Sequence, residues 1–120
     1  DFVVFNGPDE QFIGGRTMGA CGGIGGTYGA MPELFLKMNA LLKENRIEEA
    51  RKIQFAVNEI ITLLCSGHGN MYAMIKKVLK LRKGLNVGSV RSPLSPLTEA
   101  DLEIAKKTAK VIDETVARFV

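Results

Sequence analysis

The sequence predicts an α/β fold that is mostly α by content, with two strand–helix units followed by a helical body. Three observations support this prediction. Nine of the 13 glycines in this 120-residue chain lie within residues 1–29, so composition divides the chain into a glycine-rich head and a body. Residues 2–5 form an uninterrupted apolar run, typical of a strand buried on both faces. From residue 32 onward, apolar residues recur at spacings of three and four, as in amphipathic helices.

The first strand–helix unit covers the beginning of the chain to Gly19. The apolar strand at residues 2–5 is expected to end at Asn6-Gly7-Pro8. Pro8 suits the first position of a helix, and the two acids that follow it favour the positive end of a helix dipole. The predicted helix ends at Gly19. Its apolar stripe consists of Phe12, Ile13, Thr17 and Met18.

The second strand is predicted over residues 20–26, which are almost without side chains. Glycine loses the most entropy on ordering, so such a strand is expected where the backbone approaches a ligand or a crowded neighbour. The segment is not a dinucleotide-binding fingerprint, because the third glycine position falls on Tyr28. It is not a Walker loop either, because no lysine follows.

The body is predicted to contain four helices. Pro32 opens the first, and a capping-box-like segment over residues 45–48 opens the second. Gly84 ends the third, residues 84–97 form a loop, and Thr98 with Asp101 caps the last. The expected apolar faces are Leu34, Met38, Leu41 and Leu42; Ile47, Ala50, Ile53, Val57, Ile60, Ile61 and Leu64; Met71, Met74, Ile75, Val78 and Leu79; and Leu102, Ala105, Ala109, Ile112, Val116 and Phe119.

Composition excludes several classes of protein. No run of 18 apolar residues is present, so no membrane span is predicted. Cys21 and Cys65 have no metal-ligand spacing, so no metal site is expected, and both are predicted to be buried thiols of a cytosolic protein. His68 lies between two glycines and is predicted to be a loop residue. The net charge of +3 permits an anionic ligand without requiring one.

Two segments at the expected carboxyl ends of the strands have possible chemistry, because parallel α/β folds bind ligands there. In the first, Asp9 and Glu10 can accept hydrogen bonds from sugar hydroxyls, or they only cap a helix. In the second, residues 22–28 offer bare backbone that can hold a carboxylate or hydroxyl, or they form a tightly packed strand. The residues alone leave both alternatives open.

These segments, Asn-Gly-x-Asp-Glu and Gly-Gly-Ile-Gly-x-Thr-Tyr, resemble the N-acetylneuraminate lyase branch of the Schiff-base aldolase family, which also contains dihydrodipicolinate synthase. The resemblance implies a TIM (β/α)8 barrel. Residues 1–44 would form its end, with strand seven at residues 2–5 and strand eight around Gly23 and Ile24. Residues 45–120 would form the family's C-terminal three-helix extension.

The resemblance further implies reversible cleavage of N-acetylneuraminate, or a similar 2-keto-3-deoxy sugar acid, to pyruvate and an aldose, with no cofactor. The expected contacts to the sugar tail are Gly7, Asp9, Glu10, Gly25 and Gly26, with Ile24 inside the barrel near the active site. The family often has Ser where Gly26 stands. The missing side-chain hydrogen bond would cost roughly 0.5–1.5 kcal/mol of binding free energy.

No catalytic residue is predicted in this chain. The family's Schiff base forms on a lysine of strand six, whereas the lysines here, from Lys37 to Lys110, all lie in the helical body. Two strands cannot complete a barrel, so we expect a missing N-terminal part, and this chain alone is predicted to be inactive. The resemblance implies a cytoplasmic homo-oligomer, in the family a homotetramer. Alone, the strand at residues 2–5 would expose an apolar edge and self-associate or capture a partner.

Two alternatives accompany this interpretation. One is a related pyruvate aldolase, such as a dihydrodipicolinate synthase-like enzyme. The other is a helical interaction module with a basic face, suggested by a basic stretch in which Lys76, Lys80 and Lys83 share one helix face. The full stretch consists of Lys76, Lys77, Lys80, Arg82, Lys83 and Arg91. No aromatic interleaving or groove-reading motif accompanies this face, so a solvated helix surface explains it better, and neither nucleic acid nor a membrane is predicted as a partner.

Overall fold

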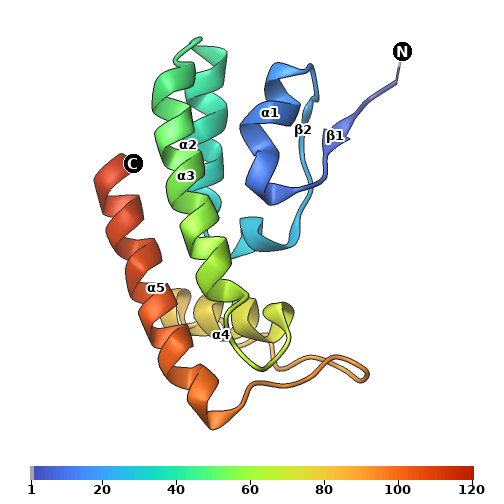
Figure 1. Ribbon diagram of the computed structural model, residues 1–120, viewed down its shortest axis with the longest axis vertical. Helices are drawn as coiled ribbons and strands as arrows, with labels where there is room; N and C mark the ends of the chain where they lie inside the picture. The colour runs from blue at the N-terminus through green and yellow to red at the C-terminus, as the bar shows by residue number, and fades with distance from the viewer. Residues whose placement is uncertain (1) are drawn as a thin grey trace.

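The computed structural model describes residues 2–120, and the fold of this part is mostly helical (Figure 1). Two short strands, two short 3-10 helices and one short α-helix precede four longer α-helices. In chain order the elements are β1 (Phe5–Asn6), η1 (Asp9–Gln11), α1 (Phe12–Thr17), β2 (Gly22–Gly23), η2 (Gly26–Gly29), α2 (Pro32–Lys43), α3 (Ile47–Leu64), α4 (Met71–Lys83) and α5 (Glu99–Phe119).

The two strands pair in parallel, with Phe5 opposite Gly22. Hydrogen bonds extend the pairing beyond the strands: the Cys21 N–H donates to the Val4 carbonyl at 2.8 Å, and the Ile24 N–H donates to the Asn6 carbonyl at 3.0 Å. Because α1 connects the strands, both run in the same direction, and their carboxyl ends point toward the start of α4 (Figure 1).

The expected burial of the first strand on both faces is wrong for this chain. Phe2 is fully exposed, and Val3, Val4 and Phe5 are 68%, 58% and 51% exposed. The physical reason is that β2 is the only strand beside β1 in the part of the chain that the structure describes, so one edge and most of both faces face solvent.

The helix predicted from Pro8 is divided in two. Residues 9–11 form a 3-10 turn, and the α-helix begins only at Phe12. The predicted apolar stripe is half wrong, because Phe12 is buried while Thr17 and Met18 are exposed. The predicted end is confirmed: the helix ends at Thr17, and Gly19 has a φ of 99°, which a residue with a side chain rarely adopts.

The four helices of the body lie where the apolar spacing predicts them. Gly84 follows α4 with a φ of 70°, as expected of a helix-ending glycine. The capping box predicted at residues 45–48 is wrong, and so is the burial of Ile47, which is 38% exposed. Arg46 occupies the cap position of α3, and its side chain turns outward to Glu44 and Glu49.

Asp101 fixes the start of α5 as the sequence predicts. Its carboxylate accepts the Thr98 N–H at 2.8 Å, which is the third-position half of the capping box. It also accepts the backbone N–H groups of His68 at 2.8 Å and Gly69 at 3.0 Å. These N–H donors, that of Thr98 foremost, hold the pKa of this buried carboxyl well below its usual range. The loop with His68 is thereby tied to α5.

The hydrophobic core is one continuous cluster that reaches from Phe12 to Ile112. Helix α3 lies between α2 and α5 (Figure 1) and contacts both. The largest fully buried side chains include Met31, Leu34, Met38, Ile53, Ile60, Leu64, Met74 and Ile112. The glycine-rich head is therefore packed on the helical body.

Both cysteines are exposed, which corrects the prediction of buried thiols. Cys21 lies beside β2, whose outer edge is uncovered in this chain. Cys65 follows the last residue of α3, and its Sγ lies 3.5 Å from the Met71 Sδ. Among residues 2–120, no helix is both long enough and apolar enough to cross a membrane.

Candidate functional site

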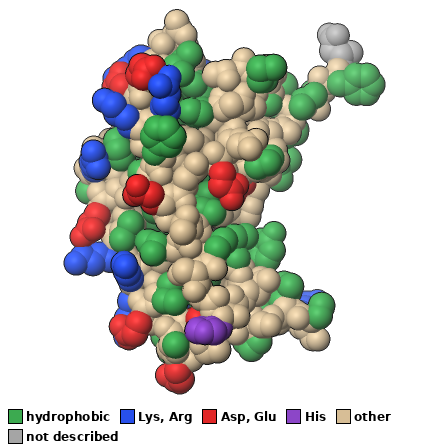
Figure 2. Space-filling model, viewed as in Figure 1, with side chains coloured by type: hydrophobic (Ala, Val, Ile, Leu, Met, Phe, Trp, Pro, Cys, Tyr) green, Lys and Arg blue, Asp and Glu red, His purple; other side chains and the backbone are tan. Residues whose placement is uncertain are grey.

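The candidate site lies at the carboxyl ends of β1 and β2. Gly7, Asp9 and Glu10 follow β1, while Gly25 and Gly26 follow β2. The 3-10 turns that contain most of these residues contact each other, and η2 also contacts α4. In Figure 2 the surface is hollowed on this side of the molecule, between the strands and the start of α4. The fold therefore brings both predicted segments to one place.

Asp9 joins the two segments through buried hydrogen bonds. Its Oδ2 accepts the Thr27 N–H at 2.8 Å and the Thr27 hydroxyl at 2.5 Å. Both residues are buried, with Asp9 only 7% and Thr27 only 2% exposed. One carboxylate oxygen thus holds η2 against η1. Hydrogen bonds to an ionised acceptor are among the strong ones, so this contact sets the spacing of the two strand ends.

The second carboxylate oxygen of Asp9 faces Gly25. A Cβ added to Gly25 would lie 1.5 Å from Oδ1 of Asp9 and 2.7 Å from Cε2 of Tyr28. No side chain fits there, because the carboxylate is held in place by Thr27. Glycine is therefore required at this position for close approach.

Side chains of helix α3 hold the first segment by binding its main-chain atoms. The Gln54 Nε2 donates to the Asp9 carbonyl at 3.1 Å, and the Asn58 Nδ2 donates to the Glu10 carbonyl at 3.3 Å. The Gln54 Oε1 accepts the Ile13 N–H at 3.1 Å. The two amides occupy neighbouring turns of α3 and are joined at 2.9 Å. They orient η1 without using the side chain of Glu10.

The remaining predicted site residues are accessible in this chain. Gly7 and Glu10 are exposed, and a Cβ added to Gly7 would meet nothing within 4 Å. Ile24 is 69% exposed, so the barrel interior predicted for it is not formed by the described residues. Gly26 is also exposed. The side chain of Glu10 is free to accept hydrogen bonds from a ligand.

Tyr28 lies behind this site, against the core. Its ring stacks on Phe35 with centroids 3.9 Å apart and meets Phe12 edge-on at 6.0 Å. Burial and the nearby charge of Asp9 raise the pKa of Tyr28. The ring lines an apolar pocket of about 260 Å³ between β2 and α2. Among the described residues, no hydrogen-bond partner meets its buried hydroxyl.

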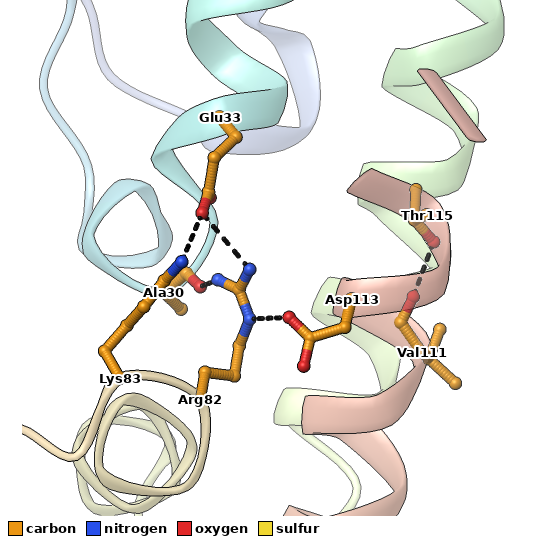
Figure 3. Close-up of polar contacts among 7 residues, drawn as sticks. All are labelled: Ala30, Glu33, Arg82, Lys83, Val111, Asp113 and Thr115. Carbon is orange, nitrogen blue, oxygen red and sulfur yellow. Dashed lines mark hydrogen bonds and ion pairs between the residues drawn. The ribbon is translucent and has the colours of Figure 1, made fainter. Parts of the chain in front are cut away.

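An ion-pair network secures the residue that follows η2 (Figure 3). The Arg82 side chain is only 2% exposed, and its guanidinium reaches Asp113 at 2.8 Å and Glu33 at 3.2 Å. It also donates to the carbonyl of Ala30. Glu33 accepts a further bond from Lys83 at 2.9 Å. The network connects α2, α4 and α5 at the end of η2.

The same network alters the predicted basic face. Partial burial acts to raise the pKa of Glu33, but Lys83 and Arg82 overcome it and lower the pKa to about 2. Arg82 points inward, and the Lys76 Nζ donates to the Ser89 carbonyl at 2.7 Å. Of the three lysines expected to share one solvated helix face, Lys80 and Lys83 are exposed and Lys76 is half-buried, so the solvated surface is largely present.

No lysine among residues 2–120 lies on a strand. All of them belong to helices α2 to α5, as the sequence predicts. His68 is a loop residue whose Nδ1 lies 3.5 Å from the buried Asp101 carboxylate, and its side chain is 77% exposed. Neither a nucleophile on a strand nor a hydroxyl–histidine–acid arrangement is present in this part of the molecule.

Sequence reasoning missed the residues that build the site from outside the two segments. Gln54 interrupts the apolar face of α3, and a polar residue at a core position is a signal of a buried hydrogen bond. Thr27 is a member of the second segment, but its pairing with Asp9 depends on the fold. No spacing rule connects Tyr72 with Gly26, 46 residues before it, although a Cβ added to Gly26 would lie 2.9 Å from the Tyr72 ring.

Comparison with known proteins places this geometry in a family. Residues 1–112 match the model of the dihydrodipicolinate synthetase family. An N-acetylneuraminate lyase from Mediterraneibacter gnavus is 54% identical over 99% of this chain, and N-acetylneuraminate lyase 2 from Escherichia coli is 37% identical over 95%. The chain spans only 38% and 37% of the lengths of these two relatives.

Solved structures of related lyases support the same family assignment. The wild-type sialic acid aldolase from Ruminococcus gnavus has a TM-score of 0.97 at 54% identity, with 99% of this chain and 40% of that chain covered. The N-acetylneuraminate lyase from Fusobacterium nucleatum has a TM-score of 0.82 at 33% identity, with 92% of this chain and 37% of that chain covered. The described residues therefore correspond to a mostly helical part of the TIM-barrel aldolase fold, and the chain belongs to the dihydrodipicolinate synthetase family.

Proposed function

We propose that the intact protein is a Schiff-base aldolase, a carbon–carbon lyase that reversibly cleaves N-acetylneuraminate or a similar 2-keto-3-deoxy sugar acid to pyruvate and an aldose. The observation that carries the proposal is the 54% identity, across 99% of this chain, with an N-acetylneuraminate lyase. The chain spans 38% of that lyase, so the proposal concerns the whole protein to which this chain contributes.

Within that protein, residues 1–44 would be the end of the (β/α)8 barrel, from strand seven to helix eight, and residues 45–120 the C-terminal three-helix extension. The parallel pairing of β1 and β2 through α1 supports this division, since successive barrel strands are parallel and joined by helices. Barrel enzymes bind their substrates at the carboxyl ends of the strands, and the candidate site lies at that end of both.

The proposed ligand at this site is the hydroxyl-rich tail of the open-chain sugar acid. The exposed Glu10 would accept hydrogen bonds from hydroxyls, and the tail would approach the exposed backbone of Gly7 and Gly26. Gly25 would contribute to the site by admitting the Asp9 carboxylate beside it. Asp9 has one oxygen engaged with Thr27, so it would combine a positioning role with at most one free acceptor. Ile24 would line the barrel interior beside the substrate.

The bond-breaking chemistry would come from outside this chain. Schiff-base formation needs an amine placed at the site, and every lysine among the described residues lies in a helix of the body. A related structure is described as a catalytic lysine mutant of the Ruminococcus gnavus sialic acid aldolase. The aldolase from that organism therefore has a catalytic lysine. We therefore expect the 120-residue chain alone to be inactive. From the resemblance to the lyase family, we also expect the intact protein to be a cytoplasmic homo-oligomer.

The test uses the intact protein and N-acetylneuraminate. Released pyruvate is measured by coupled reduction with lactate dehydrogenase, and treatment with pyruvate and borohydride is followed by mass spectrometry. We expect pyruvate release and a permanently labelled intact protein, but no label on the 120-residue chain. Labelling of that chain would contradict the assignment of the nucleophile to the missing part. Condensation of pyruvate with aspartate semialdehyde, without cleavage of any sugar acid, would instead support a dihydrodipicolinate synthase-like enzyme.

A further inference from the structure

The first turn of α4 lies over the end of β2. A Cβ added to Gly26 would lie 2.9 Å from Cε1 and 3.7 Å from Cζ of Tyr72. Contacts this short do not occur for real Cβ atoms, so the ring occupies the space that a side chain at residue 26 would need. Gly26 and Tyr72 therefore form a matched pair, although they come from opposite halves of the chain.

The backbone beneath Tyr72 is held on both sides. The Asn70 side chain accepts the Tyr72 N–H at 2.9 Å, and the Asn70 N–H donates to the Ser95 carbonyl at 2.9 Å. Tyr72 is 49% exposed and does not belong to the core cluster. A half-exposed aromatic residue outside the core cluster, with its backbone held in place, is not needed for core packing.

The part of the ring nearest Gly26 is the half that carries the hydroxyl, because Cε1 and Cζ are the contacting atoms. The hydroxyl is thus presented at the end of β2, where Gly25 and Gly26 provide no side chain. A tyrosine combines an apolar ring face with a hydroxyl that donates and accepts hydrogen bonds. Both properties suit a polyol, whose C–H groups pack on rings and whose hydroxyls need partners.

We propose that Tyr72 is a specificity-determining residue of the sugar-tail site, supplied by the C-terminal helical extension, and that Gly26 is glycine to admit its ring. This inference rests on the proposed function. It assigns to Tyr72 the hydrogen bond to a tail hydroxyl that no side chain at residue 26 can make. The hollow between the strands and the start of α4 in Figure 2 is the space into which the tail would fit.

The first experiment removes only the hydroxyl. In the intact protein, Tyr72→Phe should raise KM for N-acetylneuraminate by about 3- to 10-fold, the loss of one hydrogen bond, with kcat nearly unchanged. In the condensation direction, KM for N-acetylmannosamine should rise similarly, while KM for pyruvate should stay within about 2-fold, since pyruvate lacks the tail. Leu81→Ala is the control: Leu81 lies on the same helix and is 43% exposed, and its substitution should leave all three KM values unchanged.

The second experiment tests the pairing of the two residues. Gly26→Ser should lower kcat/KM at least about 10-fold by pressing a side chain on the ring, and the same change in Tyr72→Ala should lower it far less. Equal losses in both backgrounds, or an unchanged sugar KM in Tyr72→Phe, would overturn the inference while an active wild type upholds the proposed function. A wild-type protein that cleaves no sugar acid would overturn the proposed function and, with it, this inference.

Discussion

Substitution of Arg82 by alanine should destabilise the protein far more than the same substitution at Arg46. Both guanidinium groups contact two carboxylates: Arg82 contacts Glu33 and Asp113, and Arg46 contacts Glu44 and Glu49. The distances favour Arg46, at 2.7 Å to each acid, against 3.2 and 2.8 Å for Arg82. What separates them is burial, because the Arg46 side chain is 48% exposed and that of Arg82 only 2%.

The expected loss of stability depends on how exposed Glu33 and Asp113 are once Arg82 is removed. Removing one member of a buried ion pair costs about 3–5 kcal/mol, mostly because the other charge is left without a partner. Here Asp113 is 59% exposed and Glu33 is 25% exposed and keeps Lys83, so water and Lys83 offset part of the loss. We therefore expect about 2–3 kcal/mol for Arg82→Ala and at most about 1 kcal/mol for Arg46→Ala.

The assay is thermal unfolding of the intact protein, followed by circular dichroism at a fixed scan rate. A loss of 2–3 kcal/mol should lower the apparent Tm by about 4–10 °C for Arg82→Ala, whereas Arg46→Ala should change it by less than about 3 °C. An equal or larger effect at Arg46 would refute the reasoning, since it would mean that contact distance, and not burial, decides the strength of these ion pairs.

Three further predictions use the same assay. Thr27→Val removes the hydroxyl that donates to the buried Asp9 carboxylate at 2.5 Å and should cost about 1.5–3 kcal/mol; no change in Tm would show that this bond is not needed. Gly25→Ala forces a Cβ onto Asp9 and should lower the Tm strongly, whereas Gly14→Ala, which meets nothing within 4 Å, should not. The N–H groups that donate to Asp101 depress its pKa, so its stabilisation is complete above about pH 5 and is lost progressively as the pH falls from the ordinary pKa of an aspartate toward the depressed one. The Tm of the wild type should therefore fall more steeply between pH 5 and pH 2 than that of Asp101→Asn, and parallel curves would contradict this assignment.

The body of the fold could be predicted because its signals are local. The start of α5 is set by Thr98 and Asp101, three positions apart, and the sequence contains both partners of that hydrogen bond. The end of α4 at Gly84 depends on the conformation of a single residue. The start of α3 shows the limit of such signals, because the expected capping box is absent and Arg46 at the cap position pairs with Glu44 and Glu49.

The burial and the contacts of the glycine-rich head were harder to predict, because they depend on residues far away in the sequence. The run at residues 2–5 has the composition of a doubly buried strand, but among residues 2–120 only β2 lies beside β1, so these side chains are exposed. The turn at residues 9–11 is shaped by Gln54 and Asn58, more than 40 positions later, which bind its carbonyl groups. The motifs predicted that the two segments would meet at the ends of the strands, whereas the contacts that join them, such as that of Thr27 with Asp9, required the folded chain.

The manner in which α3 holds the first segment has a consequence for how such a site can evolve. Gln54 and Asn58 bind main-chain oxygen atoms, which every residue type possesses. Glu10 can therefore be substituted without loss of the hydrogen bond from Asn58 to its own carbonyl, and a new side chain would start from the same backbone position. The position of the η1 backbone therefore does not depend on which side chain residue 10 carries. A substitution at residue 10 can thus change the chemical group presented at the end of β1 while the backbone that presents it stays the same.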